Sequence, residues 1–268
     1  GQSSPVKIDL DSIKPDHDGI KKDASWYFGI HGWTGNYNCT PITPELVKEI
    51  HKFENSNIIF VDWEKGASNV YYPTAALSAK LVGSVIADVI NNLVKRGVAK
   101  KDKIYLIGFS LGGHVVGFIG KNLYSKYKWK PKKITSIDPA GPLYDDKPPE
   151  DRIDSTDAEY VEVFHASGDK LGFWKPIGHV DIYINKGTTR QPGCGMFEDI
   201  SGSCSHAFGK TVYGNYTHLR MQAYKCISFE NFTKGHCGAD VKVWCEVGFK
   251  YPQCKQGVYH LNTGSYFE

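Results

Sequence analysis

A serine flanked by glycines stands where an apolar segment gives way to a segment of helical periodicity. Residues 103–109 read KIYLIGF, and apolar side chains recur at about helical spacing over residues 111–123. This order predicts a strand, a sharp turn at Ser110 and a helix. Gly108 and Gly112 allow such a turn, because glycine tolerates unusual backbone angles and close packing of a helix on a strand. A serine in this position is typical of a nucleophile that attacks a carbonyl carbon.

An aspartate at the end of another expected strand is a candidate for the acid that orients a catalytic base. Asp138 follows the apolar segment 132–137 and precedes Pro139-Ala140-Gly141-Pro142, a turn that would hold its carboxylate in place. In open parallel sheets the reactive groups lie at the carboxyl ends of the strands, and Asp138 fits this rule. Asp154 and Asp157 are alternatives, but no strand precedes them. A turn or capping role is the alternative for Asp138 itself.

The base is expected to be a histidine that follows the acid, since serine, acid and histidine is the chain order of α/β-hydrolases. His206 stands two residues after Cys204 at the start of an expected helix, so a disulfide would fix its backbone. An ordinary surface or core role is the alternative for every histidine. The histidines late enough in the chain are His179, His206, His218, His236 and His260.

The elements that must position these residues alternate between strands and helices. This alternation predicts an α/β fold, with a mostly parallel central sheet flanked by helices. We expect one α/β-hydrolase domain over residues 1–268, in which residues 225–268 form a short, cysteine-rich C-terminal extension. The further strands are expected at Trp26–Ile30, Asn57–Trp63, Tyr160–His165 and Val180–Asn185, and the further helices at Pro44–Phe53, residues 75–95 and Ser205–Tyr224.

Composition limits the possible functions. The 268 residues are 41% hydrophobic, enough for a sizeable core, and the net charge of +3 gives no strong case for nucleic-acid binding. No apolar run approaches the roughly 18 residues of a membrane span. The chain opens with the polar GQSSPVKIDLDS, which lacks the core of a signal peptide. It therefore fits a cytosolic protein, or a secreted one whose signal has been removed.

The cysteines favour secretion. Six of the seven lie late in the chain without the C-x-x-C spacing of zinc sites, which indicates disulfides in an oxidising compartment. Sequons at Asn38, Asn215 and Asn231 agree with a secreted glycoprotein. The pairing is open, but nearest neighbours would close the shortest loops and leave Cys39 over. Those pairs are Cys194 with Cys204, Cys226 with Cys237, and Cys245 with Cys254.

Several stretches together resemble the animal pancreatic-type lipase family, and within it insect secreted lipases and venom-type phospholipases A1. They are HGWTGN at 31–36, VDW at 61–63, GFSLGGH at 108–114, DPAGP at 138–142, GHVDIYINKGTTRQPGC at 178–194 and CSH at 204–206. The resemblance implies an α/β-hydrolase with the catalytic triad Ser110, Asp138 and His206. It implies oxyanion-hole amides at Trp33 and Leu111, and no metal or organic cofactor.

Two departures from the family bear on the expected substrate. Only residues 195–203 separate Cys194 from Cys204, so the lid, with Met196 and Phe197, is short. Phe173 and Trp174 are expected either to line the acyl pocket or to pack inward. The chain ends without the C-terminal β-sandwich of the pancreatic enzymes. We therefore expect a phospholipase A1 or a short-lid lipase that needs no colipase.

Two other functions are compatible with the same motifs. Lipase-like insect proteins include a fatty acid hydroperoxide dehydratase, and the same base could remove the carbon-bound proton beside a peroxide and form a keto fatty acid. The yolk proteins of the family are non-catalytic lipid carriers, although they lack the serine that is present here. Residues 126–133 (KYKWKPKK) interleave lysines with aromatics and could make transient contact with a membrane surface, the alternative being a solvated helix end.

Overall fold

A single nine-stranded sheet runs through the part of the chain that the computed structural model describes. The described residues are 7, 13–14, 19–197, 199–215, 221–237, 243–247 and 254–264. In spatial order the strands are β2 (Ser56–Val61), β1 (Ser25–Ile30), β3 (Ile104–Phe109), β4 (Lys133–Ile137), β5 (Val161–His165), β6 (Val180–Ile184), β9 (Gly257–Leu261), β7 (Met221–Lys225) and β8 (Trp244–Val247).

In this spatial order, the first seven strands, which end with β9, are parallel to their neighbours. Strands β7 and β8 at the end of the sheet form antiparallel pairs. β9 lies beside β6 in a register that pairs Val180 with Gly257 and Ile184 with Leu261. The described part of the expected C-terminal extension therefore adds strands to the central sheet. Because the parallel strands run in one direction, their carboxyl ends share one edge, which we call the catalytic edge.

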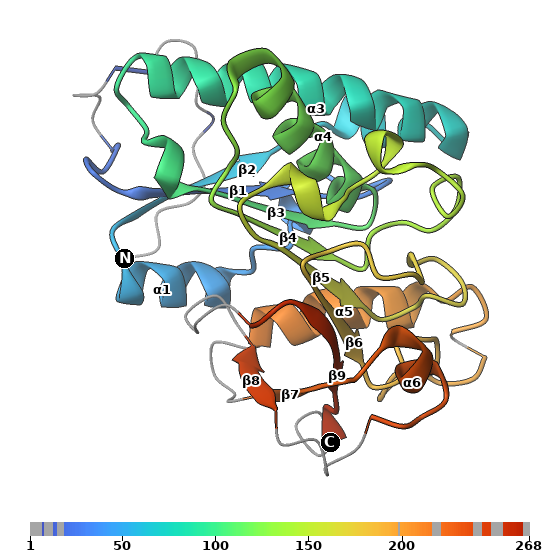
Figure 1. Ribbon diagram of the computed structural model, residues 1–268. Helices are drawn as coiled ribbons and strands as arrows, with labels where there is room; N and C mark the ends of the chain where they lie inside the picture. The colour runs from blue at the N-terminus through green and yellow to red at the C-terminus, as the bar shows by residue number, and fades with distance from the viewer. Residues whose placement is uncertain are drawn as a thin grey trace.

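Helices cover both faces of the sheet (Figure 1). The helices α3 (Tyr72–Lys95) and α4 (Leu111–Tyr127) lie on one face, and α1 (Pro44–Phe53) and α5 (Ser203–Asn215) lie on the other. Successive strand residues feed opposite cores, since side chains alternate across a strand. Leu106 packs in the core under α3 and α4, whereas Ile107 packs in the core under α1 and α5. The α/β-hydrolase fold predicted from the sequence is thus confirmed.

Helix α3 is long and apolar enough, by composition alone, to cross a membrane. Small buried residues on one side of it, Ala75, Ala79, Gly83 and Ala87, let it pack closely on α4 instead. A side chain at Gly83 would place its Cβ 2.4 Å from the Cβ of Phe118. The side of α3 that carries these small residues is therefore buried in the domain.

The helix expected over Ser205–Tyr224 was wrong at its C-terminal end. Helix α5 ends at Asn215, and Met221–Lys225 forms strand β7 between β8 and β9. The partners of β7 come from later in the chain, so pairing with them overrides the local pattern.

Three disulfides join nearest neighbours, as the short loops suggested. The bonds are Cys194–Cys204, Cys226–Cys237 and Cys245–Cys254. Cys39 is a free, exposed thiol.

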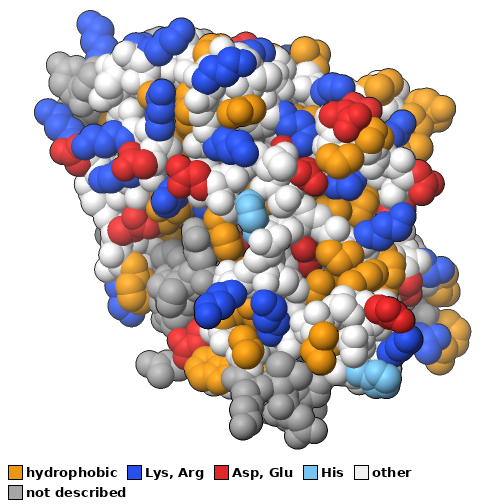
Figure 2. Space-filling model, viewed as in Figure 1, with side chains coloured by type: hydrophobic (Ala, Val, Ile, Leu, Met, Phe, Trp, Pro, Cys, Tyr) orange, Lys and Arg blue, Asp and Glu red, His pale blue; other side chains and the backbone are white. Residues whose placement is uncertain are grey.

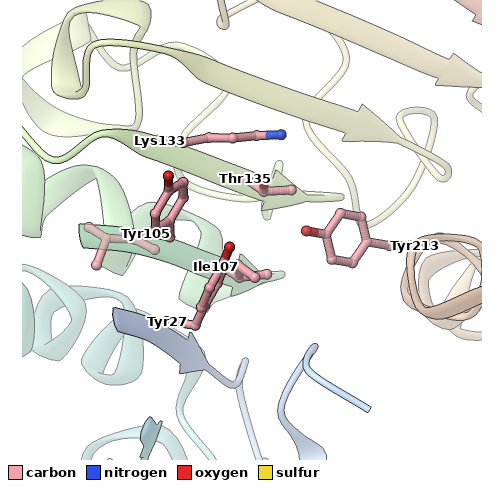
Figure 3. Close-up of a pocket in the computed structure, with 7 residues that line it drawn as sticks. Tyr27, Tyr105, Ile107, Lys133, Thr135 and Tyr213 are labelled. Carbon is pink, nitrogen blue, oxygen red and sulfur yellow. The ribbon is translucent and has the colours of Figure 1, made fainter. Parts of the chain in front are cut away.

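A small cavity lies on the α5 face of the sheet (Figure 3). Its volume is about 20 Å³, and Tyr27 and Tyr105, whose rings stack at 4.8 Å, face Tyr213 across it. This volume suffices for about one water molecule, so the cavity is a packing defect rather than a substrate site.

Candidate active site

Ser110 occupies the turn between β3 and α4 in a strained conformation. Its φ of 56° and ψ of −123° are rare for a residue with a side chain. The turn is held by backbone hydrogen bonds to the next strand: Ser110 N donates to Ile137 O at 3.0 Å, and Ala140 N donates to Ser110 O at 3.2 Å. Strain of this kind persists only where the surroundings impose it, and it is characteristic of functional sites.

Two glycines make this turn sterically possible. A Cβ on Gly108 would lie 2.2 Å from the carbonyl oxygen of Gly112. A Cβ on Gly112 would lie 2.4 Å from the carbonyl oxygen of Ile30. Backbone atoms cannot give way as side chains do, so packing requires glycine at both positions.

Asp138 lies at the carboxyl end of β4 and is fully buried. Its Oδ1 accepts hydrogen bonds from Ala166 N (2.7 Å) and Ser167 N (3.2 Å), and its Oδ2 accepts one from Ser167 Oγ at 2.5 Å. The donors come from the segment that follows β5, the neighbouring strand. They replace the water that the carboxylate loses on burial.

His206 completes the hydrogen bonding of this carboxylate. Its Nδ1 donates to Asp138 Oδ2 at 2.6 Å, and its ring lies 4.7 Å from the ring of Phe109, the residue before Ser110. The first turn of α5 is fixed by the Cys194–Cys204 disulfide and by a hydrogen bond of 2.9 Å from His206 N to Gly202 O. The acid and the base expected from the sequence are therefore in contact.

The rival acids have structural roles. The side chain of Asp154 caps the short helix Ser155–Asp157. The side chain of Asp157 accepts a hydrogen bond from Asp154 N, which completes a capping box. Asp157 also forms a buried ion pair with Lys121 at 2.5 Å. Burial nevertheless raises the pKa of Asp157 to about 7.

Of the rival bases, His179 accepts a hydrogen bond from Val161 N at 3.0 Å and stacks on Tyr160, which is a structural role. His236 is exposed, His260 is half-buried in β9, and His218 lies outside the described residues. None of these described histidines contacts Asp138.

The turn after β1 lies directly against the serine. A Cβ on Gly32 would lie 2.8 Å from the Cβ of Ser110. The N–H groups of Trp33 and Leu111 donate to no protein acceptor within residues 19–197. These are the two amides that the resemblance assigns to an oxyanion hole.

A buried pair that sequence reasoning missed supports this turn. Trp63 Nε1 donates to His31 O at 2.9 Å, and Trp63 N donates to His31 Nε2 at 3.2 Å. Burial lowers the pKa of His31 and favours the neutral ring, and the contact of Nδ1 with Gly32 O at 2.9 Å assigns the remaining proton to Nδ1, so Nε2 can accept. The motifs HGW and VDW are thus one structural unit, a link that neither motif reveals alone.

The four residues expected at a lid or acyl pocket separate into three environments. Phe173 is 1% exposed and packs in the core, with its ring in a T-shaped contact with His114, so it packs inward, which was one of its two expected placements. Trp174 is half-buried and packs on Phe229 at 5.6 Å. Met196 and Phe197 are exposed in the loop between Cys194 and Cys204.

One cluster has the composition of a metal site but cannot act as one. Cys194, Cys204 and Asp199 bring their ligand atoms within 4.8 Å of one another. The two sulfurs are joined in a disulfide and offer no thiolate. Asp199 instead accepts hydrogen bonds from Ser205 N and Ser205 Oγ.

Comparison with known proteins decides the family. Residues 11–266 match the family model described as Lipase. The chain belongs to the lipase family. Among curated members it is 35% identical to mouse (Mus musculus) lipase member H over 237 residues, which cover 87% of this chain and 50% of that protein. It is 36% identical to mink (Neovison vison) lipoprotein lipase over 230 residues, which cover 78% of this chain and 47% of that protein.

The chain thus spans about half the length of the curated lipases that it matches. Among solved structures, an α/β hydrolase from a Medee basin deep-sea metagenome library is 19% identical and has a TM-score of 0.30, covering 55% of this chain and 57% of that one. The fold assignment of this lipase-family chain accordingly rests on its sheet order and its serine turn.

Proposed function

We propose that this lipase-family chain hydrolyses acyl esters of lipids with Ser110 as nucleophile, His206 as base and Asp138 as the residue that orients the base. The observation that carries the proposal is the 2.6 Å hydrogen bond from His206 Nδ1 to Asp138 Oδ2, at the sheet edge where Ser110 is presented. With Nδ1 occupied in this way, Nε2 is the nitrogen left to receive the serine proton.

The reaction proceeds in two halves. Ser110 Oγ attacks the ester carbonyl while His206 Nε2 takes its proton, and the protonated histidine then gives that proton to the departing alcohol. Water, activated by the same histidine, attacks the acyl-enzyme and releases the carboxylic acid. Asp138 stabilises the imidazolium through its hydrogen bond to Nδ1.

The oxyanion formed in each half is stabilised by the amides of Trp33 and Leu111. Both N–H groups are free of protein acceptors within residues 19–197 and flank the serine turn. A preorganised donor of this kind contributes a few kcal/mol, about 3, to the transition state.

Exposed apolar side chains around the catalytic edge support a lipid substrate. Val70 is 91% exposed and Phe197 84%, in loops that follow β2 and β6. Hydrophobic side chains are visible in Figure 2 along the side of the molecule where the arrowheads of β1 and β3 end in Figure 1. Segments that follow parallel strands begin at the catalytic edge, so exposed apolar side chains in them support contact with an apolar partner there. Further exposed apolar side chains in the segments after β2, β4 and β6 are Tyr71, Leu143, Met196 and Ile200.

Within lipid esters we propose a phospholipase A1 or short-lid lipase activity, as in the insect and venom enzymes that the motifs resemble. The loop closed by Cys194–Cys204 is short and leaves Met196 and Phe197 exposed, so it covers little of the catalytic edge. We also propose that the protein is secreted. Three disulfides and the exposed sequon at Asn38 support it, whereas Asn231 is half-buried and the side chain of Asn215 lies outside the described residues.

A substrate panel tests this proposal. The protein and its Ser110→Ala variant are incubated with phosphatidylcholine labelled separately on each acyl chain, with a triglyceride and with a polyunsaturated fatty-acid hydroperoxide. Release of the sn-1 acyl chain by the unmodified protein alone is the expected result. A keto fatty acid formed equally by both proteins would establish the dehydratase instead, and lipid retained without turnover would establish a carrier.

A further inference from the structure

A second cavity opens at the carboxyl ends of β6 and β9, apart from the triad. Its volume is about 680 Å³, and its walls come from the turn after β6, the end of β9 and the helix α6 (Phe229–Thr233) with the residues after it. β6 lies three strands from β3, and β9 four. At about 4.8 Å per strand, the cavity lies about 15 to 20 Å along the sheet edge from Ser110.

The walls of this cavity are fixed before any ligand arrives. The Cys226–Cys237 disulfide closes a short loop around α6, and Ser228 Oγ caps that helix by accepting from Asn231 N at 3.1 Å. On the opposite wall, Asn185 Nδ2 donates to Thr263 Oγ1 at 3.0 Å and ties the turn after β6 to the end of β9. A preformed cavity avoids the entropy cost of ordering loops on binding.

One end of the cavity is aromatic. Trp174 and Phe232 line it, with their ring centroids 6.1 Å apart. Tyr183 backs both rings, at 5.5 Å from Trp174 and 4.3 Å from Phe232. An apolar group placed there is buried against carbon on several sides, which favours its transfer from water.

The charge that lines the cavity is positive. Its lining residues, all within the described part of the chain, include Lys186 and Lys234 and no acidic side chain. Lys234 Nζ is engaged by Glu230 at 2.6 Å, whereas Lys186 is exposed and forms no ion pair within the described residues. Burial lowers the pKa of His260, so this lining residue stays neutral at pH 7.

We infer that this cavity binds an anionic amphiphile, with its carboxylate or phosphate on Lys186 and its apolar part against Trp174 and Phe232. Lys186, which has no ion-pair partner within the described residues, matches the charge of such a ligand. The aromatic wall beside it matches the apolar part. A free fatty acid and the headgroup end of an anionic phospholipid share this chemistry. The inference does not depend on catalysis by Ser110, because no residue of the triad lines the cavity.

Calorimetric titration of the full chain carrying Ser110→Ala tests the inference, since that variant leaves an ester ligand intact. The probes are decanoate and dihexanoyl phosphatidic acid, each below its critical micelle concentration, with zwitterionic dihexanoyl phosphatidylcholine as the comparison of zero net charge. We expect saturable binding of at least one anion that weakens about tenfold in Lys186→Gln, the loss of one charge-assisted hydrogen bond. Binding by decanoate alone identifies a fatty-acid site, and binding by phosphatidic acid alone identifies a phosphate site.

Matched variants keep the test specific. Lys65→Gln removes an exposed lysine of the short helix Glu64–Ala67 and should leave both affinities unchanged, and Lys186→Arg should retain binding. Equal affinity in Lys186→Gln and the parent, or saturable binding by neither anion, would overturn the inference. Because these variants need no turnover, the result is independent of whether the chain hydrolyses esters.

Discussion

Ser167 Oγ donates a 2.5 Å hydrogen bond to the same carboxylate oxygen of Asp138 that accepts from His206. The hydroxyl also lies 3.4 Å from His206 Nδ1, so it sets where the imidazole meets the carboxylate. Ser167→Ala should lower kcat for ester hydrolysis about tenfold, because a charge-assisted hydrogen bond contributes about 1.5 to 3 kcal/mol. KM should change little, since Ser167 is buried and cannot touch the substrate.

The control for this change is Ser125→Ala, which removes an exposed hydroxyl near the C-terminal end of α4. Steady-state kinetics on a soluble short-chain ester across a range of pH give kcat and KM separately. Ser167 has no positioning role if its alanine variant matches Ser125→Ala in kcat and in pH profile.

The support of the oxyanion turn can be weakened without touching the substrate. Trp63→Phe keeps the aromatic packing on His31 but removes the indole N–H that donates to His31 O. We expect a loss of about 1 to 3 kcal/mol in the free energy of unfolding, because a buried carbonyl loses its donor. We also expect kcat for ester hydrolysis to fall, because the turn that carries the Trp33 amide loses this support. Urea unfolding and ester kinetics on the same preparation check both, and an unchanged kcat would disconnect this pair from the active site.

The disulfides should differ in what they support. Replacing Cys194 and Cys204 together by serine frees the start of α5, where His206 is held, and should reduce both kcat and stability. Replacing Cys245 and Cys254 opens a loop of similar length far along the sheet and should reduce stability alone, by about 2 to 3 kcal/mol. Equal losses of kcat in the two double variants, measured at a temperature where both are folded, would argue against anchoring of the base.

A buried histidine should make the fold sensitive to acid. Burial lowers the pKa of His114 to about 3, while its ring bonds to Ala140 O at 2.7 Å and stacks on Tyr144. The folded pKa lies below the unfolded one, so the stabilising effect of a neutral His114 is present above about pH 6.5 and is lost as pH falls toward 3.

The corresponding measurement is urea unfolding at pH 7 and at about pH 4.5, for the parent and for His114→Gln. The free energy of unfolding of the parent should fall about 2 kcal/mol further than that of the variant, which has no proton to take up. An identical pH dependence for both proteins would show that His114 does not resist protonation.

Local patterns predicted much of this site, because its main parts are coded by short stretches. The glycines beside Ser110 are demanded by contacts with Gly112 and Ile30, and the rule that places acids at strand ends selected Asp138. Chain order and the neighbouring cysteine selected His206, which the structure brings to Asp138.

The parts that sequence could not predict depend on which elements become neighbours. Ser167 meets Asp138 only because β5 lies beside β4, and His31 meets Trp63 because β2 lies beside β1. The local pattern predicts helix up to Tyr224, whereas Met221–Lys225 forms a strand because its partners β8 and β9 come later in the chain. Phe173 could have faced a pocket or the core, and only the packing of the loop after β5 decides this.

The central claim is that Ser110 is a nucleophile activated by His206, and covalent trapping tests it most directly. The protein is treated with a fluorophosphonate, and peptide mass spectrometry locates the label in the parent and in His206→Ala. The account predicts stoichiometric labelling of Ser110 in the parent, with loss of ester hydrolysis in parallel, and little labelling in the variant. Full ester turnover by a protein whose Ser110 remains unlabelled would contradict it.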